Sequence, residues 1–177
     1  ADVYKRQTNT MLNQIIQDAI NEQINNELYS SYSYLSKSAY CEHKQFAGAA
    51  SWMRIQSQEE YNHAMRLYDF LIARNGRVEL SPIAQPAFDF ESIPNVFVQA
   101  LEQEKVVTNQ IDALYELAFK EKAFAALVEL EWFVQEQVDE DKAARDIVHK
   151  FEMIKEDPAA LLDLDRELGA RDASDAE

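Results

Sequence analysis

Apolar residues recur at steps of three and four along most of this chain, and glycine and proline are scarce within those stretches. A period near 3.6 residues is typical of amphipathic helices with one buried stripe. The pattern predicts an all-α protein with four long helices and a short last one. The expected ranges are about 9–40, 46–75, 94–119, 122–154 and 158–168, within a single domain that spans residues 1–177.

Polar residues mark several helix boundaries. Asn9 is of a type that caps helix N-termini, and the letters CEHK at 41–44 predict a polar turn after the first helix. Asn75 and Gly76 are the residue types that favour helix C-termini. Residues 77–92 contain two prolines and no helical period. We therefore expect them to form a long crossover loop that spans a helical bundle from end to end.

The second half of the chain needs one break that no residue marks. After Pro94, helical periodicity continues to residue 154 without glycine or proline. A single rod of that length would measure about 90 Å at 1.5 Å per residue, too long for a domain of this size. We place the break near residues 119–122 by length alone. Asp157 and Pro158 then suit the cap and first position of the short last helix.

Composition and charge narrow the function classes. The 177 residues are 47% hydrophobic, which suits one compact domain. The net charge of -15 argues against nucleic-acid and anionic-membrane partners and favours cations. Cys41 is the only cysteine, so an internal disulfide is excluded. Neither the opening ADVYKRQTNT nor any later run is apolar enough for a signal peptide or a membrane span, so we expect a cytoplasmic protein.

Polar residues interrupt the apolar stripe of all four long helices. They are Glu27 in the first, Glu60 and His63 in the second, Glu104 in the third, and Gln137 and Glu140 in the fourth. A buried carboxylate without a partner takes up a proton or costs several kcal/mol, and no lysine or arginine lies in these stripes. Two divalent cations would neutralise four carboxylates, and the i, i+3 spacing of Glu60 and His63 lets both bind one metal.

Each of these residues also has a simpler interpretation. A single glutamate at the edge of a stripe is more often solvated surface, and a lone inward histidine is more often an ordinary core residue. The coincidence of an acid at mid-stripe on four helices, with the histidine at i+3, favours a dinuclear metal site instead.

With these motifs the sequence resembles the bacterial non-haem ferritins over nearly its whole length. The resemblance is carried by NELYSSYSYLS, QEEYNHAMRLYDFL, the helix with Glu104, and EWFVQEQVDED. It implies a ferritin-like four-helix bundle with a long crossover connection and a short fifth C-terminal helix. It also implies a cage, a 24-mer of identical chains, that stores ferric mineral.

The resemblance also implies a ligand set. One iron would be held by Glu27, Glu60 and His63, and a second by Glu60, Glu104 and Glu140, with Gln137 close by. A third iron site would be formed by Glu59, Glu136, Asp139 and Glu140. Asp139 is shorter than the glutamate expected there, and the run 136–141 has the alternative of being exposed acidic surface.

Other positions refine the resemblance. Tyr34 follows Glu27 by seven residues on the same face, and it resembles the family tyrosine that supplies an extra electron; its alternative is a core aromatic. Haem is not expected, because Tyr61 stands where haem-binding relatives have methionine. Gln137 and Glu140 replace the second Glu-x-x-His of rubrerythrin-like proteins, which implies a second iron that is held less firmly and passes to the mineral.

The implied activity is that of a ferroxidase, which oxidises Fe(II) to Fe(III) with O2 or H2O2 and deposits ferric oxyhydroxide. Two other classes stay open at this point. A cage subunit without catalytic activity would lack ferrous oxidation. A di-iron oxygenase or peroxidase would require an organic substrate for turnover.

Overall fold

The computed structural model describes residues 12–175, which form five α-helices, one 3-10 helix and no strand. The helices are α2 (Gln14–His43), α3 (Ala47–Ala73), α4 (Ile93–Lys120), α5 (Phe124–Ile154) and α6 (Pro158–Gly169), followed by the 3-10 helix η1 (Ala173–Asp175). The predicted all-α class is confirmed. No helix in this part of the chain is long and apolar enough to cross a membrane.

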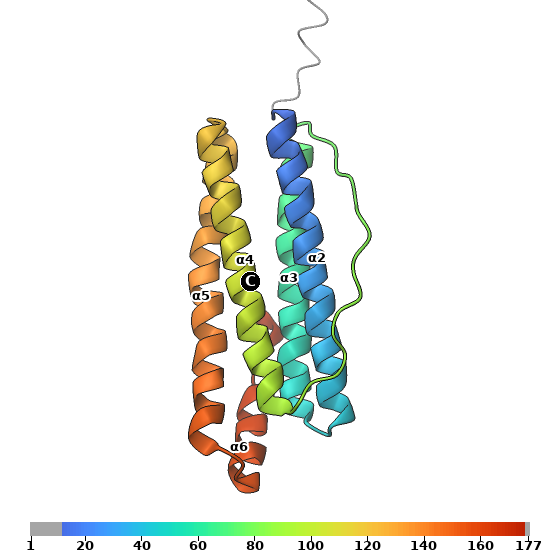
Figure 1. The fold of residues 1–177 in the computed structure, drawn as a ribbon, viewed down its shortest axis with the longest axis vertical. Coiled ribbons are helices and arrows are strands. Elements are labelled where there is room, and N and C mark those ends of the chain that lie inside the picture. The colour runs from blue at the N-terminus through green and yellow to red at the C-terminus, as the bar shows by residue number, and fades with distance from the viewer. Residues whose placement is uncertain (1–11, 176–177) are drawn as a thin grey trace, which may run out of the picture.

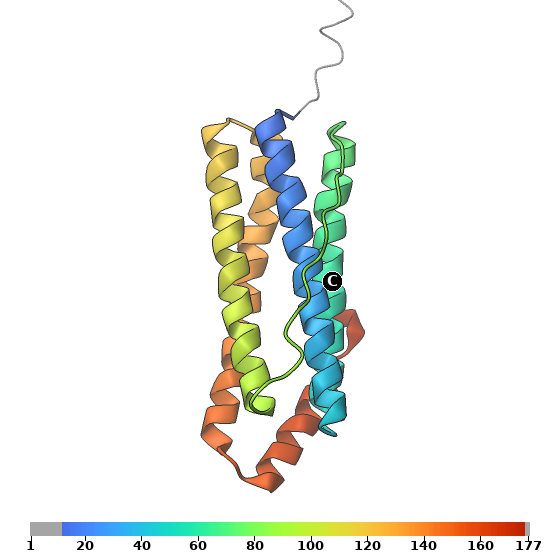
Figure 2. The same cartoon turned by 45° about the vertical axis from the view of Figure 1, so that its right-hand side comes forward.

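Four long helices lie side by side as a bundle, and the direction of each follows from its connection (Figure 1). Short turns make α2 and α3 antiparallel, and likewise α4 and α5. The connection 74–92 returns along the whole length of α2, so α4 runs parallel to α3 (Figure 2). The short α6 packs at one end of the bundle, mainly against α3. This is the predicted ferritin-like bundle with a long crossover and a short fifth helix.

The ends of α2 differ from the prediction. Asn9 lies outside the described residues; the N-cap of α2 is Asn13, whose side chain accepts a hydrogen bond from the amide of Ile16 at 2.9 Å. The polar turn expected at 41–44 is wrong, because α2 continues to His43. Cys41 is completely buried in the core, and this burial outweighs the polar letters around it.

The crossover connection has no regular structure, so its backbone needs hydrogen-bond partners from elsewhere. Side chains along one line of α2 supply them. Asn21 donates to the carbonyl of Arg77 at 2.9 Å and accepts from the amide of Glu79 at 2.8 Å. Further along, the Tyr40 hydroxyl donates to the carbonyl of Phe90 at 3.0 Å. The extended segment is therefore fastened to α2 at both ends.

The turn between α4 and α5 lies at residues 121–123. This is close to the break near 119–122 that the length of the helical run predicted. Lys122 has a φ of 54°, a left-handed conformation that glycine or asparagine adopts more readily. The amide of Ala123 donates to the carbonyl of Ala118 at 2.9 Å and closes the end of α4. The sequence has no signal here because a lysine occupies the position that usually carries glycine.

Two apolar clusters fill the bundle, one toward each end. The cluster near α6 includes Phe97, Phe151 and Leu164, and the other includes Ile20 and Leu130. On each long helix, a buried polar residue separates the segments that belong to the two clusters. The polar side chains of the four helices therefore form one layer across the middle of the core.

Close backbone contact joins α6 to the start of α3. A Cβ added to Gly48 would lie 1.7 Å from the carbonyl oxygen of Asp165, and one added to Gly169 would lie 3.0 Å from the Gly48 Cα. The Asp165 carboxylate accepts hydrogen bonds from the amides of Gly48 and Ala49 at 3.2 and 2.8 Å. Because Phe46, the N-cap residue of α3, makes no side-chain cap, α6 provides the cap for α3.

Substitution of Gly48 by alanine will therefore destabilise the protein, despite the higher helix propensity of alanine. The added methyl group overlaps the backbone of α6, which cannot move aside as a flexible side chain could, so a loss of about 1–3 kcal/mol or more is expected in urea-induced unfolding. Ser51→Ala, at an exposed position on the same helix, is the control and should change stability little. Unchanged stability of Gly48→Ala would contradict this packing.

Candidate metal centre

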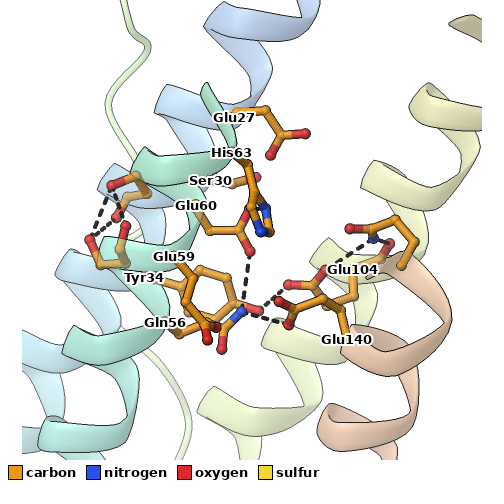
Figure 3. A network of polar contacts seen from close by, with 12 residues as sticks. Glu27, Ser30, Tyr34, Gln56, Glu59, Glu60, His63, Glu104 and Glu140 are labelled. Carbon is orange, nitrogen blue, oxygen red and sulfur yellow. Dashed lines mark hydrogen bonds and ion pairs between the residues drawn. The ribbon is translucent and has the colours of Figure 1, made fainter. Parts of the chain in front are cut away.

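The polar layer brings together the residues that interrupt the predicted stripes. Their side chains converge from all four long helices (Figure 3). Exposure is 1% for Glu27, 0% for Glu60, 5% for His63, 1% for Glu104, 4% for Gln137 and 8% for Glu140. Side chains predicted from sequence to face inward therefore do so.

Three groups of side chains could each hold a metal ion, because their ligand atoms lie within 4.8 Å of one another. The groups are Glu27, Glu60 and His63; Glu60, Glu104 and Glu140; and His63, Glu136 and Glu140. Glu60 belongs to the first two and Glu140 to the last two. Shared carboxylates of this kind can bridge neighbouring ions, so the layer has the donor arrangement of a multinuclear site with hard oxygen ligands.

Two buried oxygen atoms in the first group have no hydrogen-bond partner. They are one carboxylate oxygen each of Glu27 and Glu60. His63 Nδ1 lies 3.4 Å from that same Glu60 oxygen. Buried polar atoms in folded proteins almost always have a partner, so these two oxygens and the nearby imidazole fit a bound cation.

The carboxyl groups are far from their ordinary acidity. Burial, followed by repulsion from Glu60, raises the pKa of Glu27 well above its usual value. Burial and the charge of Glu104 raise the pKa of Glu60 well above its usual value. Burial and the charge of Glu60 raise the pKa of Glu140 in the same way. Without a metal, the layer therefore retains protons that a cation would displace.

Amide side chains from α3 and α5 donate hydrogen bonds to the acids. Gln56 Nε2 donates to Glu60 at 3.2 Å and to Glu140 at 2.6 Å. Gln137 Nε2 lies 3.2 Å from a Glu104 oxygen and 3.1 Å from the Thr108 hydroxyl. Gln56 thus links carboxylates from two helices.

Tyr34 lies within this layer. It is completely buried, and its hydroxyl donates a short hydrogen bond to Glu104. Burial, followed by the negative charge of Glu104, raises the pKa of Tyr34 well above its usual value. The phenol therefore keeps its proton and is directly connected to one of the candidate ligands.

The residues of the expected third site are only partly brought together. Glu136 and Glu140 meet, but the third member of their group is His63. Asp139 is exposed and belongs to none of the three groups. Glu59 is buried, and its carboxylate forms an ion pair with Arg171 at 2.8 Å.

Two largely buried cations lie near the acids, although no lysine or arginine occupies the predicted stripes. Arg171 reaches the layer from beyond α6, which no periodicity in the sequence could indicate. Lys37 on α2 is only 4% exposed, and its ammonium donates to Ser33 and Gln103 at 2.8 Å each. It also lies 5.4 Å from the ring centre of Tyr34. Its burial became visible only in the structure, because α2 contacts both α3 and α4 and so buries a wider face.

Comparison with known proteins agrees with this fold. The sequence profile of the family described as Ferritin, Ferritin-like domain, matches residues 17–154. The bacterial non-heme ferritin of Staphylococcus aureus is 32% identical over 161 residues, 91% of this chain and 97% of its own. A probable bacterial non-heme ferritin-like protein of Haemophilus influenzae is 33% identical over 159 residues, 90% of this chain and 96% of its own.

Solved structures give the same result. The open-pore ferritin of the hyperthermophilic archaeon Archaeoglobus fulgidus superposes with a TM-score of 0.91 at 42% identity, covering 92% of this chain and 99% of its own. A closed form of that ferritin, engineered by site-directed mutagenesis, has a TM-score of 0.90 at 43% identity, covering 91% and 98%.

Fold and site define a four-helix-bundle protein with a carboxylate-rich candidate metal centre. The match to the family profile and the identity to curated relatives identify it further: the chain belongs to the ferritin family. The resemblance to bacterial non-haem ferritins drawn from the motifs is thereby confirmed.

Binding of a divalent cation to the layer should release protons. Because the carboxyl pKa values are raised in the folded state, the metal-free protein loses stability as the pH rises from the ordinary carboxyl pKa toward these raised pKa values. A bound cation replaces the protons that the carboxyl groups hold. Calorimetric titration with Zn²⁺ in two buffers of different ionisation enthalpy should show release on the order of one proton per ion. Glu60→Gln should release fewer. A binding enthalpy independent of the buffer would contradict the prediction.

Burial lowers the pKa of Lys37 from 10.5 to about 8. Between these two pKa values the unfolded chain binds more protons than the folded one, so the contribution of Lys37 to stability rises with pH. Below about pH 8 the ammonium is charged in both states, and the full cost of burying that charge opposes folding. Relative to Lys37→Met, the wild type should therefore gain up to about 3 kcal/mol in unfolding free energy between pH 7.5 and 10. The exposed Lys44, replaced by methionine, is the control. A pH-independent difference would argue against a buried ammonium.

Proposed function

We propose that this protein is an iron-storage ferritin with ferroxidase activity. Fe(II) is its substrate, O2 or H2O2 is the oxidant, and ferric oxyhydroxide is deposited inside a cage of 24 copies. The observation that carries the proposal is the pair of ligand groups that share Glu60, with one buried oxygen each of Glu27 and Glu60 that has no hydrogen-bond partner. Membership in the ferritin family supports storage and oxidation of iron in general.

In this proposal, each ligand group holds one ferrous ion. Glu27 and His63 bind the first ion, Glu104 and Glu140 the second, and Glu60 bridges them. Ions that share a carboxylate lie about 3.5–4 Å apart in proteins, close enough to react with one oxidant molecule. Each Fe(II) gives one electron, so O2 takes up two electrons and two protons to form H2O2; H2O2 as oxidant takes up the same and forms two waters.

Neighbouring side chains tune this reaction. Gln137 offers a neutral amide near the second ion instead of an imidazole, so that the ferric product is held less firmly and can leave for the mineral. In this proposal Tyr34 would supply a further electron; its hydroxyl is hydrogen-bonded to Glu104. A third ion would bind beside the pair, with Glu136 and Glu140 as the ligands that both the resemblance and the geometry support; Glu59 and Asp139 are the expected ligands that the geometry does not bring into a group.

The complete ligand groups weigh against a cage subunit without catalytic activity. An oxygenase or peroxidase acting on an organic substrate would reuse its iron, and it would not accumulate ferric mineral. Aerobic loading with Fe(II), followed by gel filtration and iron analysis of the protein peak, separates these classes. A large assembly that carries many iron atoms per chain supports storage, whereas a small species without mineral contradicts it.

Replacement of Glu60 tests the centre directly. Because Glu60 belongs to two ligand groups, Glu60→Ala should slow ferrous oxidation by more than about 100-fold, beyond the 10–100-fold typical of losing a residue that only supports a ligand. Absorbance of the ferric product after aerobic mixing with Fe(II) measures the rate. Glu152→Ala, which removes an exposed acid from α5, should oxidise iron as the wild type does. Equal rates for Glu60→Ala and the wild type would exclude this centre.

A further inference from the structure

Arg171 reaches the metal centre from outside the four-helix bundle. It follows α6, in a segment that returns along α3. Its Nη2 donates to Glu59 Oε2 at 2.8 Å, and its Nη1 donates to Gln56 Oε1 at 3.0 Å and to the carbonyl of Trp52 at 3.4 Å. The guanidinium also stacks over the Trp52 ring, 4.7 Å from its centre. Three α3 residues spaced by one helical turn thus hold one arginine.

This pairing is well protected from water. The side chains of Arg171 and Glu59 are 17% and 10% exposed. A buried ion pair is weak support for stability, but breaking it leaves the remaining charge buried without a partner. A planar guanidinium with several donors can bind a carboxylate and an amide oxygen at once, which a lysine ammonium does less precisely.

The first consequence concerns Glu59. This residue directly precedes Glu60 and contributes to the charge felt by Glu104, Glu136 and Glu140. Its carboxylate nevertheless belongs to none of the three groups that could hold a metal ion. The contact with Arg171 fits this, because the guanidinium holds Glu59 Oε2 on the side of the C-terminal segment.

The second consequence concerns Gln56. An amide group can point either its oxygen or its nitrogen in a given direction. Arg171, which only donates, binds the Gln56 oxygen and thereby directs the amide nitrogen to Glu60 and Glu140. Both of these carboxylates are shared between metal-binding groups.

We propose that Arg171 is a positioning residue of the metal centre, which withholds Glu59 from metal and orients Gln56 toward the shared carboxylates. A third ion is then held by Glu136 and Glu140 without Glu59, which serves as the counter-ion of Arg171. This inference rests on the proposed binding of divalent cations by the acid layer, and on no step of iron oxidation.

Removal of Arg171 should change how many ions the protein binds. In Arg171→Ala, the freed Glu59 carboxylate becomes available, so calorimetric titration with Zn²⁺ should reveal an additional ion per chain or a clear tightening of the weakest site. The double variant Arg171→Ala/Glu59→Gln should return to the wild-type count. Arg166→Ala is the matched control, because Arg166 forms only an exposed ion pair with Asp163. If Arg171 merely fastened the C-terminal segment, Arg171→Ala would bind Zn²⁺ as the wild type does, and the proposal would be overturned.

Two further measurements keep the test decisive if Arg171→Ala does not fold. Arg171→Lys retains a charge that can pair with Glu59, so its Zn²⁺ count should equal that of the wild type; an additional ion would contradict the proposal. Anomalous scattering from wild-type crystals soaked in Zn²⁺ should place metal near Glu136 and Glu140 with the Arg171 pair intact. Zinc bound to Glu59 would overturn the inference. A wild type that binds Zn²⁺ but does not oxidise Fe(II) would remove the proposed function and leave this inference standing.

Discussion

Repulsion among carboxylates held in a dry layer is the constraint on which the rest of this structure depends. Two apolar clusters enclose the layer from both ends, so water cannot screen Glu27, Glu60, Glu104 and Glu140. The metal-free chain relieves the repulsion with protons and with donors from neutral side chains. Hydrogen bonds from the amide side chains partly offset the negative charge of the carboxylates, and the carboxylates remain as possible metal ligands. The layer is thus poised to exchange protons for cations.

Two largely buried cations, Arg171 and Lys37, flank this layer in different ways. Arg171 forms a direct ion pair with Glu59, whereas Lys37 is held by the hydroxyl of Ser33 and the amide of Gln103. A guanidinium keeps its charge in nearly any surroundings, while burial lowers the pKa of the Lys37 ammonium toward neutrality. The charge at the Lys37 side therefore depends on pH.

Much of the fold was predictable because the signals are local. Helical periodicity located the four long helices, and two prolines without a helical period located the crossover. The prediction was wrong at the end of α2, where the polar residues around Cys41 indicated a turn. Burial of Cys41 in the core favours helix there, and α2 continues to His43. Lys122 shows the complementary case: its left-handed backbone makes the α4–α5 turn, and only the length of the helical run indicated a break there.

The sequence by itself determined which faces of the four helices are buried and that acids interrupt each of them, since both follow from spacing along a helix. Tertiary structure alone decided how those acids are divided into groups and which of them are paired with cations. Glu59 and Glu60 are neighbours in sequence, yet one faces Arg171 and the other lies at the centre of two ligand groups. Successive helical residues point about 100° apart, so adjacent carboxylates meet different parts of the fold, and a segment 112 residues away determines the role of Glu59.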